Sequence, residues 1–317
     1  MPNVCGRLTV GLMLPAAANT DDGQVDTARL LETAGRAEAA GFDGVYVGDH
    51  LLHPRPLLEA LITLAAVAAT TKRVDIGTCV MLAALRQPLW LARQLGTLAC
   101  FAPGRLRIGI GVGGEYKLEF EAIGVPLAER GQRVAEILRL VKGLLSGEPI
   151  PGLGEGATKA RIEPVPRHPV PFLLAGWKEV ALERAAALAD GWIGYLLSAE
   201  SFARRRHFLQ QRRAELGGAP FITGMLLPVH LDRRLEGAQL RAAEAWGRIT
   251  ENGVTFPPRL FVAGPPAAIV EQLHRYWEAG CSEMVLSLVD QGVGFLDQLD
   301  LLATEVLPRL RGFAGNA

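Results

Sequence analysis

The chain has 317 residues, 49% of them hydrophobic, and its 33 basic residues balance its 33 acidic ones. This length allows one large α/β domain as readily as two ordinary ones. The formal net charge is therefore zero, and the chain lacks the excess of basic residues that binds nucleic acid or an anionic membrane. We expect neither as a partner. No apolar run approaches the roughly 20 residues of a membrane span.

The cysteines lie far apart and include no C-x-x-C pair, which argues against a zinc ribbon or a redox dithiol. A reduced, cytoplasmic setting without a metal centre fits this usage best. The four are Cys5, Cys79, Cys100 and Cys281.

The first repeated unit of the chain sets the expected fold. Residues 24–40 carry leucine and alanine at helical spacing, and Gly41 stands where a helix C-terminal glycine belongs. The apolar run Val45–Val47 follows and stops at Asp49 and His50. A buried parallel strand has this pattern when its C-terminal end opens onto a site.

The same alternation continues along the chain. Eight strands are predicted, at Leu8–Leu14, Gly44–Gly48, Val74–Met81, Leu106–Gly111, Phe172–Ala175, Trp192–Leu196, Ile222–Leu231 and Glu283–Leu288. Helical patterns separate most of them, over 56–70, 88–100, 127–145, 179–189 and 295–311. This count indicates a (β/α)8 barrel, with an open doubly wound sheet as the competitor.

Two connections are long, and both are expected as excursions near a barrel mouth, after strands four and seven. Residues 146–171 are crowded with glycine and proline, and residues 232–266 include a short helical piece near 241–251. No linker separates two parts, so the sequence predicts a single barrel domain over residues 1–317.

Asp49 and His50 are the first candidates for chemistry, because residues at the C-terminal strand ends of a barrel face its active site. A histidine there can hydrogen-bond a ligand or move a proton near neutral pH. The alternative is a helix N-cap role for Asp49 and a surface histidine.

Residues 105–114 read RLRIGIGVGG, in which Gly109, Gly111 and Gly114 spell a dinucleotide fingerprint. That fingerprint needs an acid at the end of a second strand about 20 residues on. Here the position is Glu136, inside an amphipathic helical pattern. We therefore favour a glycine loop whose N–H groups approach an anion or a flat ring, with a plain tight turn as the alternative.

Two other strand ends carry weaker signals. Cys79 in strand three is typical of a core cysteine and has no identifiable base beside it. Strand five ends at Ala175 and Gly176, whose small size allows a close backbone approach, and Trp177 either stacks on an aromatic ligand or packs.

These segments, taken in order, resemble the bacterial luciferase-like flavin oxidoreductases over nearly the whole chain. The motifs that carry the resemblance are GFDGVYVGDH (41–50), GTCVM (77–81), QPLWLARQLGTL (87–98), GRLRIGIGVGG (104–114), EFEAIGVPLAERG (119–131) and ADGWI (189–193). The resemblance implies a (β/α)8 barrel that binds coenzyme F420 or FMN at its C-terminal mouth. Members with a similar Arg-Gly helix start are mostly assigned to F420, so F420 is the expected cofactor and FMN the alternative.

The resemblance also implies roles for the ends of strands two and three. Asp49 and His50 would lie by the cofactor ring, with His50 as the hydrogen-bonding or proton-transfer residue and Asp49 as its orienting partner. Thr78, Cys79 and Val80 would meet the ring, and a non-proline cis peptide would map to Cys79–Val80.

The remaining expected cofactor contacts match positions that meet the tail or phosphate. They are Gly111, Gly113, Gly114, Ala175, Gly176 and Trp177. The chain departs from the family pattern at 99–105, and it has Glu115 and Tyr116 where a tryptophan often follows the glycine loop.

The leading hypothesis is an F420-dependent oxidoreductase that moves a hydride to or from a small organic substrate. The alternative is an FMN-dependent monooxygenase that uses reduced flavin and oxygen. A third hypothesis is a barrel that has lost catalysis and only binds a flavin or a partner. We keep this hypothesis because the chain departs from the family pattern at Cys100 and Phe101. By resemblance, a homodimer that pairs through barrel helices is expected.

Overall fold

The computed structural model describes residues 7–18, 23–150, 160–218, 220–250, 256–290, 292 and 294–315. Every pairing between its named strands is parallel. The strands are β1 (Thr9–Met13), β2 (Gly44–Val47), β3 (Asp75–Met81), β4 (Leu106–Ile110), β5 (Phe172–Ala175), β6 (Gly191–Tyr195), β7 (Ile222–Leu231), β8 (Val262–Gly264) and β9 (Glu283–Leu288).

Eight of these strands close into a ring. Neighbours pair in the order β6-β5-β4-β3-β2-β1-β9-β7, and β7 pairs with β6 again. β8 stays outside the ring and pairs with the C-terminal part of β7, at Val229–Leu231. The predicted (β/α)8 barrel is therefore confirmed, and the open doubly wound sheet is wrong.

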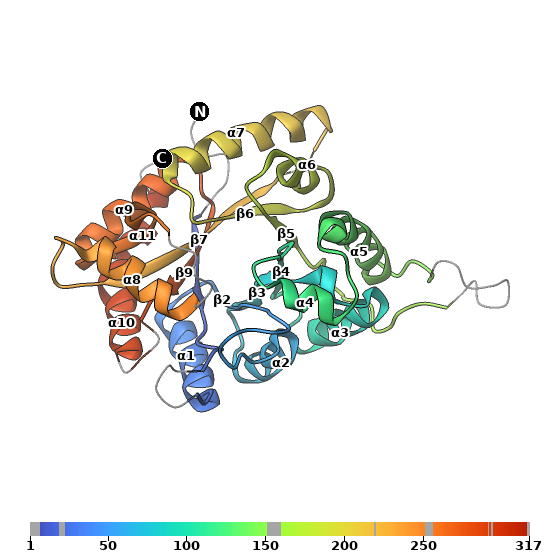
Figure 1. Ribbon diagram of the computed structural model, residues 1–317, viewed down its shortest axis with the longest axis horizontal. Helices are drawn as coiled ribbons and strands as arrows, with labels where there is room; N and C mark the ends of the chain where they lie inside the picture. Colours follow the sequence, from blue (N-terminus) through green and yellow to red (C-terminus); the bar gives the residue numbers. More distant parts are fainter. Residues whose placement is uncertain are drawn as a thin grey trace.

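Helices surround the ring on its outside (Figure 1). They are α1 (Thr27–Ala40), α2 (Ala60–Thr70), α3 (Pro88–Phe101), α4 (Lys117–Ala122), α5 (Arg130–Leu145), α6 (Glu179–Leu188), α7 (Ala199–Glu215), α8 (Ala238–Thr250), α9 (Pro266–Glu278), α10 (Phe295–Leu301) and α11 (Leu307–Arg311). Among the described residues no helix combines the length and the apolarity needed to cross a bilayer.

The eight predicted strands all form, with ends that differ by one residue at most. The excursion after β7 is confirmed: it contains α8, where the helical piece was predicted, and also β8. The position predicted for residues 146–171 is wrong, because this connection leaves the end of α5 and enters the start of β5, whereas the mouth lies at the C-terminal ends of the strands. The helix α4 lies before it, between β4 and α5. The sequence did not predict α4 or β8 because six and three residues are too short for a periodic pattern.

The lower interior of the barrel holds an ionic cluster. Tyr46 donates its hydroxyl to Glu283 at 2.8 Å, Arg107 pairs with Glu283 at 3.3 Å, and Arg107 also bonds Asp75. Burial raises the pKa of Glu283, against the lowering effect of Arg107. Gly11 leaves room for the tyrosine, because a Cβ there would lie 2.4 Å from its ring.

Above this cluster an apolar layer forms the floor of the C-terminal mouth. Its buried members are Tyr46, Cys79, Ile193 and Val285, and partly buried residues pack against them. Those partners are Met13, Val80, Ala175 and Leu226. Strand-three and strand-five residues predicted to meet the cofactor thus contribute to one surface under the mouth.

Candidate functional site

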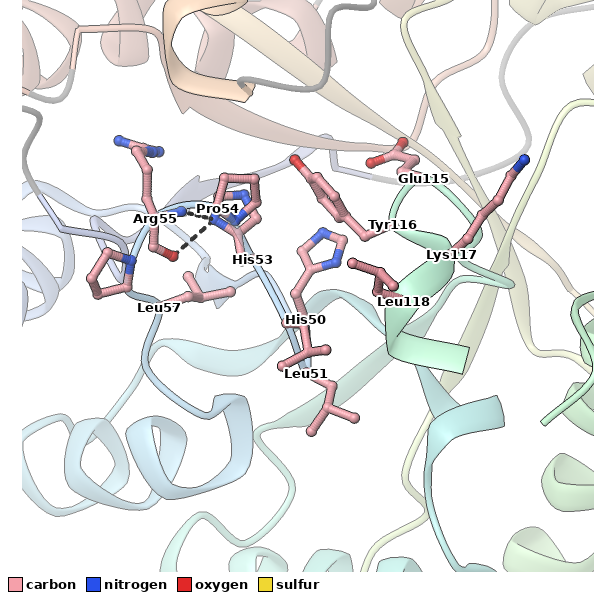
Figure 2. A pocket seen from close by; sticks show the side chains of 12 residues that line it. His50, Leu51, His53, Pro54, Arg55, Leu57, Glu115, Tyr116, Lys117 and Leu118 are labelled. Carbon is pink, nitrogen blue, oxygen red and sulfur yellow. Dashed lines mark hydrogen bonds between the residues drawn. The ribbon is translucent and has the colours of Figure 1, made fainter. Parts of the chain in front are cut away.

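The C-terminal rim of the barrel gathers the predicted site residues. His50 follows β2 and Gly113 follows β4, and parallel strands place both at the same end of the barrel. A pocket of about 720 Å³ opens here, lined by residues 50–57 after β2 and 115–118 after β4. We call it the outer pocket, and Figure 2 shows its lining.

A second, smaller pocket of about 200 Å³ shares His50, His53 and Tyr116 with the outer pocket. We call it the inner pocket, because it adds Met13 of β1 and Ser287 of β9 from the barrel itself. His50 therefore stands where the barrel mouth meets the outer pocket.

His50 is held by a buried carboxylate. Its Nδ1 lies 3.1 Å from Oε1 and 3.3 Å from Oε2 of Glu119, whose side chain is 0% exposed. The imidazole is 21% exposed, and its Nε2 has no hydrogen-bond partner among the described residues. With Nδ1 engaged, Nε2 is the nitrogen left for a ligand.

Glu119 also fixes the loop that follows His50. Its Oε2 accepts hydrogen bonds from the backbone N–H of Leu51 at 2.7 Å and of Leu52 at 3.3 Å. The residue lies in the first turn of α4, after the glycine loop. The sequence prediction missed it, since an acid in a six-residue helix carries no pattern that links it to His50.

The sequence predicted that Asp49 orients His50, and this prediction is wrong. Its Oδ2 accepts the N–H of Leu82 at 3.0 Å, and its Oδ1 pairs with Arg86 at 2.7 Å. Successive residues of an extended chain point to opposite sides, so Asp49 points toward β3 while His50 points toward α4. The orienting partner of His50 in the structure is Glu119.

Two further rings pack around His50. The ring centroids of Tyr116 and His53 lie 5.0 Å and 5.3 Å from that of His50, and 5.3 Å from each other. Burial lowers the pKa of His53, which favours its neutral form at pH 7. In Figure 2 the His50 ring lies beside Tyr116 and Leu118, at the start of α4.

The tip of β3 has the predicted backbone. The Cys79–Val80 peptide is cis, and Thr78 donates its hydroxyl to the carbonyl of Gly109 at 2.8 Å. Cys79 is buried, and burial raises the pKa of its thiol. The thiol therefore stays protonated, which makes it a poor nucleophile.

The glycine loop after β4 offers free backbone donors. Gly113 and Gly114 have φ of +63° and +110°, and neither N–H bonds another described residue. Arg130 backs the loop by donating from Nε to the carbonyl of Gly113 at 3.1 Å. Consecutive free N–H groups with a cation behind them fit a phosphate.

A second cation lies at Gly131, the residue after Arg130. The guanidinium of Arg184 on α6 lies over Gly131, where a Cβ would be 2.7 Å from Nη2. It has no hydrogen bond or ion pair within the described part of the chain. A guanidinium at the N-terminal end of α5 without a carboxylate leaves that corner positively charged.

At the tip of β5 the backbone, more than the side chains, shapes the rim. Gly176 has φ of +138°, and its carbonyl accepts the indole N–H of Trp192 at 2.7 Å. Trp177 is half-exposed, and its carbonyl accepts a bond from Arg205 at 3.0 Å. The structure places Ala175 in the floor layer.

The predicted residues divide into two neighbouring regions of one rim. His50 lines both pockets, whereas the β3 tip, the glycine loop and the β5 tip line neither of them. Glu119, which follows the glycine loop in sequence, reaches His50 and so links the two regions. Within the second region Gly111 lies against Val80, where a Cβ would be 2.6 Å from Cγ2.

Residues 8–259 match the family model described as luciferase-like monooxygenase. The chain belongs to the luciferase-like monooxygenase family. An F420-dependent glucose-6-phosphate dehydrogenase of Beutenbergia cavernae is 31% identical, and the alignment covers 87% of this chain and 91% of that enzyme. The corresponding enzyme of Nakamurella multipartita is 28% identical over 92% of this chain and 95% of that one.

Solved structures share the fold. An F420-dependent secondary alcohol dehydrogenase in complex with an F420-acetone adduct superposes with a TM-score of 0.80, at 20% identity over 96% of this chain and 99% of that one. The oxygenating constituent of 3,6-diketocamphane monooxygenase of Pseudomonas putida, in complex with FMN, reaches 0.75, at 17% identity over 95% and 98%. Such identities show the fold alone. The named relatives of higher identity are oxidoreductases, which confirms the predicted enzyme class.

Proposed function

We propose that the chain is an F420-dependent oxidoreductase that moves a hydride between the deazaflavin and a small organic substrate at the C-terminal mouth. The observation that carries this proposal is the His50–Glu119 pair at the junction of the two pockets. The F420-dependent relatives support the choice of cofactor.

When bound, the deazaflavin supplies a hydride acceptor, and the protein supplies position and proton handling. The Nδ1–H of His50 donates to Glu119, which leaves Nε2 as the base that takes or returns the substrate's hydroxyl proton. The buried carboxylate stabilises the imidazolium that forms. Glu115 also lines both pockets and offers a second carboxylate within the site.

The cofactor's phosphate end is assigned to the glycine loop. Gly113 and Gly114 would donate their free N–H groups, with Arg130 and Arg184 supplying positive charge. The ring would lie over the floor layer, against Cys79–Val80 and next to His50.

Binding titrations with F420 and FMN, each oxidised and reduced, test the choice of cofactor. We expect oxidised F420 to bind at least ten times more tightly than FMN. The substitution His50→Ala should leave F420 affinity nearly unchanged and lower kcat about 10²- to 10⁴-fold, the range of general acid–base contributions. Unchanged turnover would remove His50 from the mechanism.

An FMN-dependent monooxygenase is the second candidate, favoured by the FMN complex among the structural neighbours. A deazaflavin has carbon in place of N5 and activates oxygen poorly, so oxygen consumption distinguishes FMN-dependent oxygenation from F420-dependent hydride transfer. Oxygen consumption with reduced FMN, and none with F420, would select the second candidate.

A homodimer formed through barrel helices is also proposed. Ile62 on α2 and Trp90 and Phe101 on α3 are large apolar side chains more than half exposed. α2 and α3 pack side by side, so these residues supply an apolar face to a second copy. Light scattering on the purified chain tests this, with Trp90→Glu expected to yield monomer.

We also propose that residues 1–317 form a single domain and that the protein is cytoplasmic.

A further inference from the structure

The outer pocket has an apolar lip. Leu51, Leu52 and Leu118 line it and are 51%, 47% and 67% exposed. Large apolar side chains grouped at the mouth of a concave site mark a surface that a ligand covers. Leu57 continues this apolar wall inward, toward His53.

The charges of the outer pocket do not suit a phosphorylated substrate. Its two cations are Arg55 and Lys117. Arg55 is 8% exposed and donates to the carbonyl of Ala18 at 3.1 Å. In Figure 2 the two cations lie on opposite sides of the view, and the carboxylate of Glu115 lies nearer to Lys117. Phosphate recognition requires cations that converge, and Glu115 would repel a phosphate.

The polar groups that remain lie at the inner end of the pocket. The rings of His50, His53 and Tyr116 contact one another there, and Nε2 of His50 is free among the described residues. A ligand bound in the outer pocket would therefore meet these rings at its inner end, the charged side chains of Glu115 and Lys117, and an apolar wall that extends to solvent.

We propose that the substrate is a neutral alcohol, or the matching carbonyl compound, with an apolar chain, and not a sugar phosphate. The proposal rests on the hydride-transfer function proposed above. The hydroxyl lies at Nε2 of His50, and the chain lies along Leu57, Leu51 and Leu118 toward solvent. In oxidation the carbinol C–H bond breaks, and its electron pair leaves as hydride to oxidised F420. The O–H proton passes to Nε2 as the C=O bond forms, so the products are the carbonyl compound and reduced cofactor.

The test compares propan-2-ol, hexan-2-ol and octan-2-ol with glucose-6-phosphate, using the full chain loaded with F420. We expect kcat/KM to rise about three- to four-fold for each methylene that enters the pocket, with no saturable turnover of glucose-6-phosphate. Isothermal titration of octan-2-one against propan-2-one, with and without F420, measures the same preference without turnover.

Two variants localise the effect. Leu118→Ser should reduce the gain per methylene in both assays. Leu216→Ser is the matched control, because Leu216 is also exposed, at 55%, but follows α7 and lines neither pocket.

Glucose-6-phosphate turned over more efficiently than octan-2-ol would overturn the substrate assignment and leave the F420 function standing. Ketone affinity independent of chain length, or equally affected by both variants, would also overturn the assignment. A chain that binds octan-2-one tightly but does not bind F420 would instead refute the proposed function and retain the apolar site.

Discussion

Replacing Glu119 by glutamine changes the partner of His50 with almost no change in volume. In the native chain one carboxylate oxygen accepts the N–H groups of Leu51 and Leu52, and both oxygens lie within 3.3 Å of Nδ1 of His50. A glutamine has one oxygen and one NH₂. The oxygen is needed by the two backbone donors, so the NH₂ faces Nδ1.

An amide donor facing Nδ1 turns that nitrogen into an acceptor and moves the ring proton to Nε2. The nitrogen that faces the ligand is then protonated and cannot act as a base. We expect Glu119→Gln to lower kcat about 10²- to 10³-fold, equivalent to about 3–4 kcal/mol, with KM and F420 affinity changed less than about threefold.

Steady-state kinetics and ¹⁵N NMR of the histidine ring measure the two halves of this prediction. The NMR spectrum should show the His50 proton on Nδ1 in the native chain and on Nε2 in the variant. Glu121→Gln is the control, because Glu121 is an exposed acid on the same helix. It should behave as the native chain in both measurements.

A Glu119→Gln variant that turns over within twofold of the native rate would refute this reasoning. A lower rate with an unchanged tautomer would show that Glu119 only supports the loop. Thermal unfolding of the variant separates either result from loss of the fold.

Three further predictions follow from other parts of the barrel. Arg107→Gln leaves Glu283 buried without its cation and should cost about 3–5 kcal/mol in urea unfolding. Burial raises the pKa of Glu283 and Arg107 opposes that effect, so the folded variant should bind a proton at Glu283 more readily than the unfolded chain does. The penalty should therefore be smaller at about pH 5 than at pH 8, and a pH-independent loss would contradict this. Arg184→Gln should weaken F420 binding about tenfold in a titration while leaving the binding of riboflavin, which lacks the phosphate, unchanged; equal losses for both would exclude a phosphate contact. Gly111→Ala puts a Cβ 2.6 Å from Val80 and should destabilise the chain by about 1–3 kcal/mol in urea unfolding. A variant as stable as the native chain would contradict this, because it would show that β3 and β4 move apart at no measurable cost.

The sequence predicted the parts of the site that depend on local pattern. Asp49 and His50 follow one apolar strand, and Gly113 and Gly114 follow another. Because the C-terminal ends of parallel strands lie at the same end of a barrel, the sequence places all four residues on one rim. The partner of His50 could not be predicted this way. Glu119 lies 69 residues further along the chain, and only the closed barrel brings it to Nδ1.

The error over Asp49 has the same origin. Adjacency in sequence suggested that it orients His50, but its carboxylate turns to Arg86, 37 residues away, and to the backbone of Leu82. Short elements such as β8 escaped prediction because their pairing with β7 is decided by tertiary contact.

The most direct test of the account is a crystal structure of the chain with oxidised F420. We expect the deazaflavin ring over Cys79–Val80 with Nε2 of His50 beside its reactive edge, and the phosphate on the N–H groups of Gly113 and Gly114. A cofactor bound away from this rim, or a His50 that turns from it and leaves Glu119, would contradict the account.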